Sequence, residues 1–233
     1  MPKLPGGPLA TRPLHFIFIA DCSLSMDGAK IQTLNHAIHE AIPHMREVAR
    51  GNPNAEVLVR SVKFSSGAQW HHSQPTNVDE FEWTDLSVDG MTDMGRALSL
   101  VADTLKTPPM PDRALPPVLV LVTDGGPTDD FAAGLRALMA QPWGKKAVRL
   151  AIAIGEGEDV RLDVLQQFIG HPELQPLRAS NAEQLVKYIR WASTAVLQAA
   201  SAPASQTQAA PPGGNVPLPP PPVVGPADPN DVW

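Results

Sequence analysis

The chain has 233 residues, and its 18 lysines and arginines against 24 aspartates and glutamates give a net charge of −6. Hydrophobic residues make up 43% of it, which is enough for one sizeable core, yet no apolar run approaches the roughly 20 residues of a membrane span. The acidic balance argues against a nucleic-acid partner, and the single cysteine, Cys22, excludes an intrachain disulfide and a cysteine-based zinc site. The segment from Met1 to Pro13 lacks a secretory h-region, so we expect a cytoplasmic protein without membrane attachment.

Proline marks both ends of the chain and separates them from one central domain. Ten of the 26 prolines lie between Ser201 and Trp233, and such a composition buries too little apolar surface to offset the entropy lost on ordering. The segment from Met1 to Pro13 is a shorter proline-rich stretch. We therefore predict an N-terminal extension (residues 1–13), one folded domain (residues 14–198) and a proline-rich C-terminal tail (residues 199–233).

Apolar strand-like runs alternate with helical patterns through the predicted domain. In chain order we expect strands at Leu14–Ala20, Glu56–Phe64, Gln69–His72, Val118–Thr123 and Val148–Ile154, with a short one near Leu177. We expect helices at Ala29–Arg50, Met94–Lys106, Asp129–Met139, Asp159–Phe168 and Ala182–Gln198. Residues 16–19 and 118–122 are apolar without alternation, so both faces of these strands must be covered. The order predicts a doubly wound α/β fold, Rossmann-like, with a mostly parallel central sheet and helices on both faces.

Two local features add to these expectations. Pro43 lies inside the first predicted helix, and we expect it to kink or split that helix because proline lacks the amide hydrogen and crowds the preceding turn. His71 and His72 are adjacent in the third predicted strand, so they should point to opposite faces and could not share a metal ion.

Polar residues follow two of the buried strands, where the apolar strand patterns do not explain them. Asp21, Ser23 and Ser25 come at alternate positions directly after the first strand, Asp124 follows the strand at 118–123, and Thr92 lies just before a predicted helix. Ligands of doubly wound folds bind at the carboxyl ends of the strands. Oxygen ligands with few carboxylates suit a hard cation such as Mg²⁺, with Mn²⁺ or Ca²⁺ as alternatives. The competing interpretation is that Asp21, Ser23 and Ser25 only cap the following helix.

Three segments around these residues resemble the pieces of the metal-ion-dependent adhesion site in von Willebrand factor A (VWA) domains: Leu14–Met26, Gly90–Leu98 and Leu119–Asp130. The sequence Thr-Asp-Gly-Gly-Pro-Thr-Asp-Asp at residues 123–130 is more similar still to the bacterial TerY-like VWA proteins associated with tellurite resistance. The resemblance covers about residues 14–197. It implies a Mg²⁺ ion bound directly by Ser23, Ser25 and Thr92, and directly or through water by Asp21 and Asp124.

Leu24 and Met91 depart from this resemblance, because small residues such as glycine are commoner at both positions. We expect Leu24 to reshape its loop or to narrow the mouth of the site. The ligand residues themselves are intact, and they include no general base or nucleophile. We therefore expect a non-enzymatic interaction module whose metal takes a Glu or Asp carboxylate of a partner protein as its last ligand.

The resemblance also implies a setting for this interaction. TerY-like proteins are often encoded beside a protein kinase and a PP2C-type phosphatase, which implies a stress response or phosphorylation-linked signalling. Two other functions stay open. Asp21 could be the nucleophile of a Mg²⁺-dependent phosphohydrolase, although Ser23 stands where such phosphatases have an acid–base aspartate. The metal could instead be purely structural, in a scaffold protein.

The proline-rich tail has two interpretations. Its composition is typical of a disordered linker. Asp228, Asp231 and Trp233, however, give its last residues the acidic and aromatic character of a docking peptide. The prolines at 219–222 are expected to hold this end extended away from the domain, where it would bind a partner or the metal site of a neighbouring copy.

Overall fold

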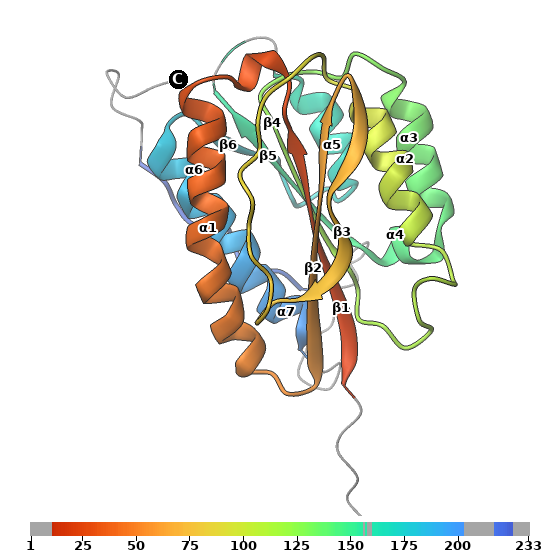
Figure 1. Ribbon diagram of the computed structural model, residues 1–233. Coiled ribbons are helices and arrows are strands. Elements are labelled where there is room, and N and C mark those ends of the chain that lie inside the picture. The colour runs from red at the N-terminus through yellow and green to blue at the C-terminus, as the bar shows by residue number, and fades with distance from the viewer. Residues whose placement is uncertain (1–10, 156, 158–159, 203–216, 226–233) are drawn as a thin grey trace, which may run out of the picture.

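A mixed β-sheet forms the centre of the domain (Figure 1). The computed structural model describes residues 11–155, 157, 160–202 and 217–225. Six strands lie in the order β3-β2-β1-β4-β5-β6, and all neighbours are parallel except β2 and β3. The strands are β1 (Arg12–Asp21), β2 (Ala55–Ser65), β3 (Gly67–Asn77), β4 (Val118–Thr123), β5 (Val148–Ile154) and β6 (Leu177–Ala179). The predicted fold class is confirmed.

Helices cover both faces of this sheet, as Figure 1 shows. One face carries α1, α6 and α7, and the other carries α2 to α5. The helices are α1 (Ala29–Arg50), α2 (Met94–Thr104), α3 (Phe131–Ala140), α4 (Pro142–Lys146), α5 (Leu162–Ile169), α6 (Ala182–Trp191) and α7 (Leu197–Ser201). A 3-10 turn, η1 (Leu24–Met26), precedes α1, and a π-helical turn, η2 (Ala192–Val196), joins α6 to α7. Within the described residues, no helix is long and apolar enough to cross a bilayer.

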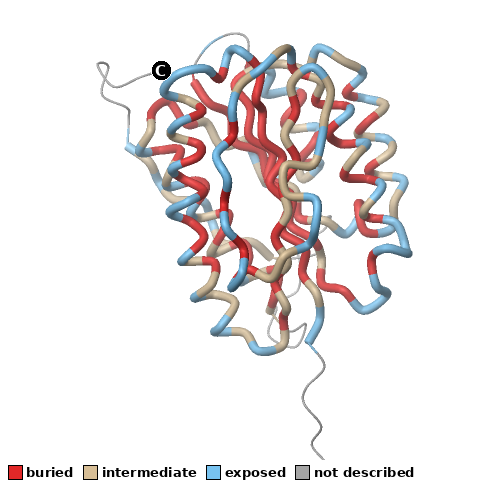
Figure 2. Tube along the Cα trace, viewed as in Figure 1, coloured by how far each residue is buried: buried red, intermediate tan, exposed pale blue. Residues whose placement is uncertain are grey.

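Neighbouring residues of the central strands belong to two separate cores. Phe16 and Phe18 of β1 face the α1 side, whereas Ile17 and Ile19 face the α2 side. All four are at most 1% exposed, and Figure 2 shows the sheet as the buried centre of the domain. Burial on both faces explains why the apolar runs of these strands show no alternation.

Pro43 does not split the first helix, so that part of the prediction is wrong. α1 runs unbroken from Ala29 to Arg50 with Pro43 inside it. The residues of its buried stripe, among them Leu34, Ile38 and Met45, are fully covered, while Pro43 lies on the exposed side. Packing of the stripe against the sheet therefore outweighs the local cost of the proline.

His71 and His72 do not point to opposite faces, because a β-bulge interrupts the pairing of β2 and β3. Ser61 pairs with His72 and Val62 with Trp70, which leaves His71 as the extra residue. The two imidazole rings lie 4.6 Å apart between centroids, and both contact the ring of Trp83, at 5.5 and 5.3 Å. The bulge thus turns both side chains to one side.

Two glycines let α2 and α3 approach closely beside the carboxyl edge of the sheet. A Cβ atom on Gly134 would lie 2.1 Å from the carbonyl oxygen of Gly95, and one on Gly95 would lie 2.4 Å from that of Asp130. Both distances are far below contact distance, so only glycine permits this packing. The close approach fixes the start of α2 against the loop that follows β4.

Part of the C-terminal tail lies against the domain. Leu218 and Val224 pack on the α1-side core, and the side-chain amide of Gln184 donates a hydrogen bond of 3.0 Å to the carbonyl of Gly225. Residues 217–225 therefore lie against the domain and do not extend away from it as expected. Asp228, Asp231 and Trp233 lie outside the described residues, as does most of the predicted N-terminal extension.

Candidate metal centre

Asp21 anchors the loop that follows β1. It is the last residue of the strand and is fully buried. One carboxylate oxygen accepts a 2.8 Å hydrogen bond from the amide of Ser23, and the other accepts a 2.5 Å hydrogen bond from the hydroxyl of Thr123 at the end of β4. Because β1 and β4 are parallel neighbours, their carboxyl ends meet at this point. Asp21 therefore ties the first loop to the end of the adjacent strand.

Serine and aspartate oxygens from these two strand ends form one hydrogen-bonded cluster. Ser23 Oγ lies 3.0 Å from Ser25 Oγ, and Ser25 Oγ donates to Asp124 Oδ1 at 2.7 Å. The ammonium group of Lys30, in the first turn of α1, lies 2.6 Å from Asp124 Oδ2 and 3.2 Å from the carbonyl of Ser25. The structure thus brings together four of the five predicted ligands and adds a cation to them.

Thr92 belongs to a third loop, which contacts both of the others. The amide of Leu24 donates to the carbonyl of Gly90 at 3.2 Å, which joins this loop to the first. The backbone of Thr92 exchanges two hydrogen bonds with Thr128, of 3.0 and 2.9 Å, which joins it to the loop after β4. Thr92 is buried, and the hydrogen bonds of its backbone to Thr128 hold it in place.

Burial changes the ionisation of two groups in the first loop. The pKa of Asp21 is raised from 3.8 to about 6, chiefly because burial disfavours its charged form and further because Asp124 is close. Hydrogen bonds from Ser23 and Thr123 oppose this rise. Burial, together with the charge of Asp21, raises the pKa of the Cys22 thiol to about 12. Cys22 is consequently a neutral thiol, and it packs within the α1-side core.

The cluster fits a hard divalent cation. Its candidate ligands are all oxygens, and the side-chain oxygen of Ser25 lies within hydrogen-bond distance of those of Ser23 and Asp124. In the part of the chain that the structure describes, no three His, Cys, Asp or Glu side chains gather into a metal-binding group. A cation here would therefore depend on hydroxyl oxygens beside two carboxylates, which suits Mg²⁺ and not Zn²⁺.

Comparisons with known proteins agree with this architecture. No protein-family model and no curated protein sequence matches the chain, whereas solved structures do. A von Willebrand factor type A protein from Catenulispora acidiphila aligns over 81% of the chain at 19% identity, with a TM-score of 0.60. The VWA2 paralog of ArnB from Sulfolobus acidocaldarius aligns over 78% at 16% identity, with a TM-score of 0.57. The pilus adhesin SpaC from Lactobacillus rhamnosus GG aligns over 80% at 13% identity, with a TM-score of 0.65.

The domain has the von Willebrand factor A fold. The chain spans 43%, 45% and 31% of the lengths of these three proteins, in the order given. Because all three identities are low, the likeness establishes the VWA fold alone. The activity of this chain has to be inferred from its own site residues.

Sequence reasoning missed two residues that organise the site in this VWA fold. A lysine in the first turn of a helix opposes the helix dipole, so Lys30 could have signalled a nearby carboxylate. Asp129 accepts hydrogen bonds of 2.8 Å from the amides of Gly95 and Arg96 and thereby caps α2. Its partners are distant in sequence, and only the folded chain reveals them.

Proposed function

We propose that this VWA domain is a non-enzymatic, Mg²⁺-dependent protein-interaction module. The ion would be held by the five oxygen ligands Asp21, Ser23, Ser25, Thr92 and Asp124. Mn²⁺ and Ca²⁺ are the alternative ions. When bound, the ion supplies a localised positive charge and an open coordination position. Two carboxylates beside a divalent ion and the Lys30 ammonium leave one net positive charge, which favours a Glu or Asp carboxylate of the partner as the last ligand.

One observation carries this proposal: exposed apolar side chains stand beside the oxygen cluster. Leu24 is 64% exposed and Met91 is 57% exposed, and they belong to the two loops that the Leu24–Gly90 hydrogen bond joins. Exposed apolar side chains next to a polar centre are typical of a protein-contact surface. We call Leu24 and Met91 the apolar rim of the site.

The rival phosphohydrolase is less well supported by the geometry of Asp21. A nucleophilic carboxylate needs an oxygen that can reach the substrate. Both oxygens of Asp21 already accept hydrogen bonds, from Ser23 and Thr123, and the residue is fully buried. This favours a ligand and positioning role for Asp21 over attack on a phosphoester.

The setting of the interaction is also a proposal. The resemblance of residues 123–130 to TerY-like proteins supports a cytoplasmic stress-response or signalling role. A protein kinase or a PP2C-type phosphatase would then be a natural partner, with an acidic residue presented to the metal.

Affinity capture with the full chain as bait tests the proposal. We expect a partner to be retained in Mg²⁺ and released by EDTA, and to be lost with Ser25→Ala. Leu24→Ser should weaken capture, whereas Val223→Ser, at a residue 97% exposed and outside the rim, should not. Mg²⁺-dependent phosphoester turnover that Asp21→Asn abolishes would overturn the proposal. Capture unaffected by EDTA, with only thermal stability lowered, would favour the structural-metal alternative.

A further inference from the structure

The side chain of Asp93 does not have the role that its position in the fold predicts. Asp93 is the N-cap residue of α2, and an aspartate there ordinarily accepts a hydrogen bond from an amide of the first helical turn. Its side chain makes no capping bond. Asp129, in the loop after β4, accepts instead from the amides of Gly95 and Arg96. Capping of α2 therefore does not explain the aspartate at position 93.

Both oxygens of the Asp93 carboxylate accept hydrogen bonds from neighbouring loops. Oδ2 accepts a 2.9 Å hydrogen bond from the amide of Gly67, the first residue of β3. Oδ1 accepts one of 3.2 Å from the hydroxyl of Thr128, in the loop after β4. The side chain is only 17% exposed. One carboxylate thus joins the β2–β3 turn to the loop after β4, directly beside the candidate ligand Thr92.

The bond from Thr128 to Asp93 also orients the hydroxyl that holds the backbone of Thr92. A threonine hydroxyl has one hydrogen, and here that hydrogen is donated to Asp93. Its lone pairs are left to accept the 3.0 Å hydrogen bond from the amide of Thr92. Asp93, Thr128 and Thr92 therefore form a short relay of hydrogen bonds that ends on the backbone of a candidate ligand.

The β2–β3 turn holds the residues on either side of Thr92. The amide of Met91 donates to Ser66 Oγ at 3.1 Å, and the amide of Asp93 donates to the carbonyl of Ser65 at 2.9 Å. Thr92 is therefore held between this turn and the loop after β4, and the Asp93 carboxylate is a bridge between the two.

We propose that Asp93 is a positioning residue of the metal site, which sets the position of Thr92 through its hydrogen bonds and not through its charge. This inference rests on the proposed function. The carboxylate fixes the β2–β3 turn and Thr128 relative to each other, and both of them bind the backbone around Thr92. A ligand held in this way needs little rearrangement when the ion binds, so less of the binding free energy is lost in ordering the site.

Asparagine in place of Asp93 separates hydrogen bonding from charge. Its side-chain oxygen can accept from Gly67 while its nitrogen donates to Thr128 Oγ, so the two loops stay joined. In calorimetric titration of the full chain with MgCl₂, we expect Asp93→Ala to weaken Mg²⁺ binding about tenfold, and Asp93→Asn to keep the wild-type affinity. Equal weakening in the two variants would overturn the positioning role, and so would unchanged affinity in Asp93→Ala.

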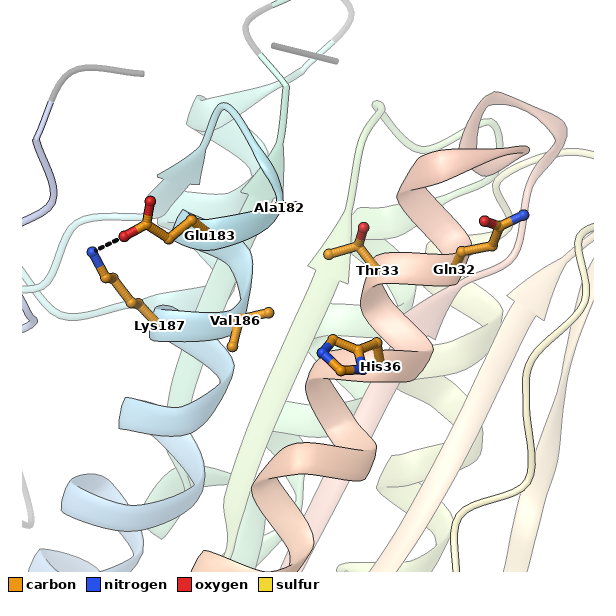
Figure 3. Close-up of a pocket in the computed structure, with 7 residues that line it drawn as sticks. All are labelled: Gln32, Thr33, His36, Ala182, Glu183, Val186 and Lys187. Atoms are coloured by element: carbon orange, nitrogen blue, oxygen red, sulfur yellow. Dashed lines mark ion pairs between the residues drawn. The ribbon is translucent and has the colours of Figure 1, made fainter. Parts of the chain in front are cut away.

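Glu183→Ala is the matched control for the loss of one acidic side chain at the start of a helix. Figure 3 shows Glu183 in α6, beside the groove between α1 and α6, where its carboxylate pairs with Lys187 at 2.6 Å. The Glu183 side chain is 71% exposed, so its charge is screened by solvent. Mg²⁺ affinity should not change in Glu183→Ala. A loss as large as that of Asp93→Ala would show an effect of net charge and would overturn the positioning role.

Amide hydrogen exchange in EDTA tests the positioning role without metal. Asp93→Ala should speed exchange at Gly67, which loses its acceptor, and at Thr92, whose acceptor is released, whereas Asp93→Asn should not. The amide of Ala133, which donates to Asp130, is the internal control. Equal acceleration at Ala133 would mean general destabilisation and would overturn the local role. If the wild type bound no Mg²⁺, the proposed function would fail, whereas these exchange rates would still decide whether Asp93 joins the two loops.

Discussion

Asp21 and Asp124 are the two charged members of the oxygen cluster. We expect Asp21→Ala and Asp124→Ala each to abolish metal-dependent partner capture while leaving the fold largely intact, because each also removes acidic repulsion from the cluster. Asp21→Ala should in addition lower the free energy of unfolding by about 1–3 kcal/mol, since the buried Ser23 amide and Thr123 hydroxyl lose this acceptor. Thr92→Ala should weaken capture more mildly, since a neutral hydroxyl contributes less charge. Circular dichroism and binding should be measured on the same samples. Loss of binding through unfolding alone would contradict this, and a larger effect at Thr92 than at Asp21 would mean that the ligand roles are misassigned.

Lys30 forms an ion pair of 2.6 Å with Asp124. The Asp124 side chain is 1% exposed and that of Lys30 is 25% exposed. We expect Lys30→Met to lower the free energy of unfolding in EDTA by about 1–3 kcal/mol, because a buried carboxylate loses its charged partner. Mg²⁺ should bind more tightly, since the competing cation is gone. Denaturation and Mg²⁺ titration measure the two effects.

Lys106→Met is the matched control for Lys30→Met. Lys106 lies at the same 2.6 Å distance from Asp103, but both side chains are at least half exposed. Such a surface pair contributes about 0–1 kcal/mol, and Mg²⁺ affinity should not change. Similar losses of stability in the two variants would contradict the role assigned to Lys30.

The raised pKa of Asp21 predicts a pH dependence with a definite sign. Its pKa is about 6 in the folded chain against 3.8 ordinarily, so the folded chain holds a proton that the unfolded chain has lost between these values. Stability without metal therefore falls as pH rises from about 4 to 6, by about 3 kcal/mol in total. Mg²⁺ binding should conversely weaken below pH 6, where a proton occupies the carboxyl.

Asp21→Asn isolates this effect. Burial lowers the pKa of His15 and His72 to about 4, and their contribution has the opposite sign, since stability is lost as pH falls from 6.5 toward 4. Both histidines remain in the variant, so the difference between wild type and Asp21→Asn in EDTA reports Asp21 alone. A difference that does not change between pH 4 and 6 would contradict the assignment.

Local motifs explain how far the site could be predicted at the scale of single residues. Asp21, Ser23, Ser25 and Asp124 lie directly after buried strands, and this position is visible in sequence. The cation beside them was not predicted, because Lys30 meets Asp124 across 94 positions of the chain.

The packing of α2 on α3 supports the loop that carries Thr92. Gly134→Ala should lower the free energy of unfolding by about 1–3 kcal/mol, because a Cβ would lie 2.1 Å from the Gly95 carbonyl. Mg²⁺ affinity should fall with it as the start of α2 shifts. Gly51→Ala, whose Cβ would lie 3.4 Å from its nearest contact, should change stability by about 0.5 kcal/mol or less. Equal effects in thermal melts of both variants would contradict the close-approach argument.

Helices and strands were predicted well where a single hydrophobic pattern dominates the segment. They were predicted poorly where tertiary packing determines the local conformation. The two-sided strands β1 and β4 have unmistakable apolar runs. Pro43 was expected to kink or split α1, but the buried stripe holds the helix unbroken. The bulge at His71 depends on how β2 and β3 pair, so it could not be predicted from the sequence of β3 alone.

The doubly wound, mostly parallel architecture followed from the alternation of strands and helices, since parallel strands need helical crossovers. The strand order β3-β2-β1-β4-β5-β6 was not predicted from the sequence. The path of residues 217–225 along the domain could not be predicted from the composition of the tail. Leu218 and Val224 are scattered among prolines, and their packing on the domain depends on a surface that α6 and its neighbours create.

Direct titration of the full chain with Mg²⁺ at pH 7.5 tests the central claim, that the oxygen cluster at the carboxyl edge is a metal site. We expect the wild type to bind a single Mg²⁺ ion, and Ser25→Ala and Asp124→Ala to lose this binding while Lys106→Met retains it. Absence of Mg²⁺ binding in the wild type, or unchanged binding in Asp124→Ala, would contradict the account.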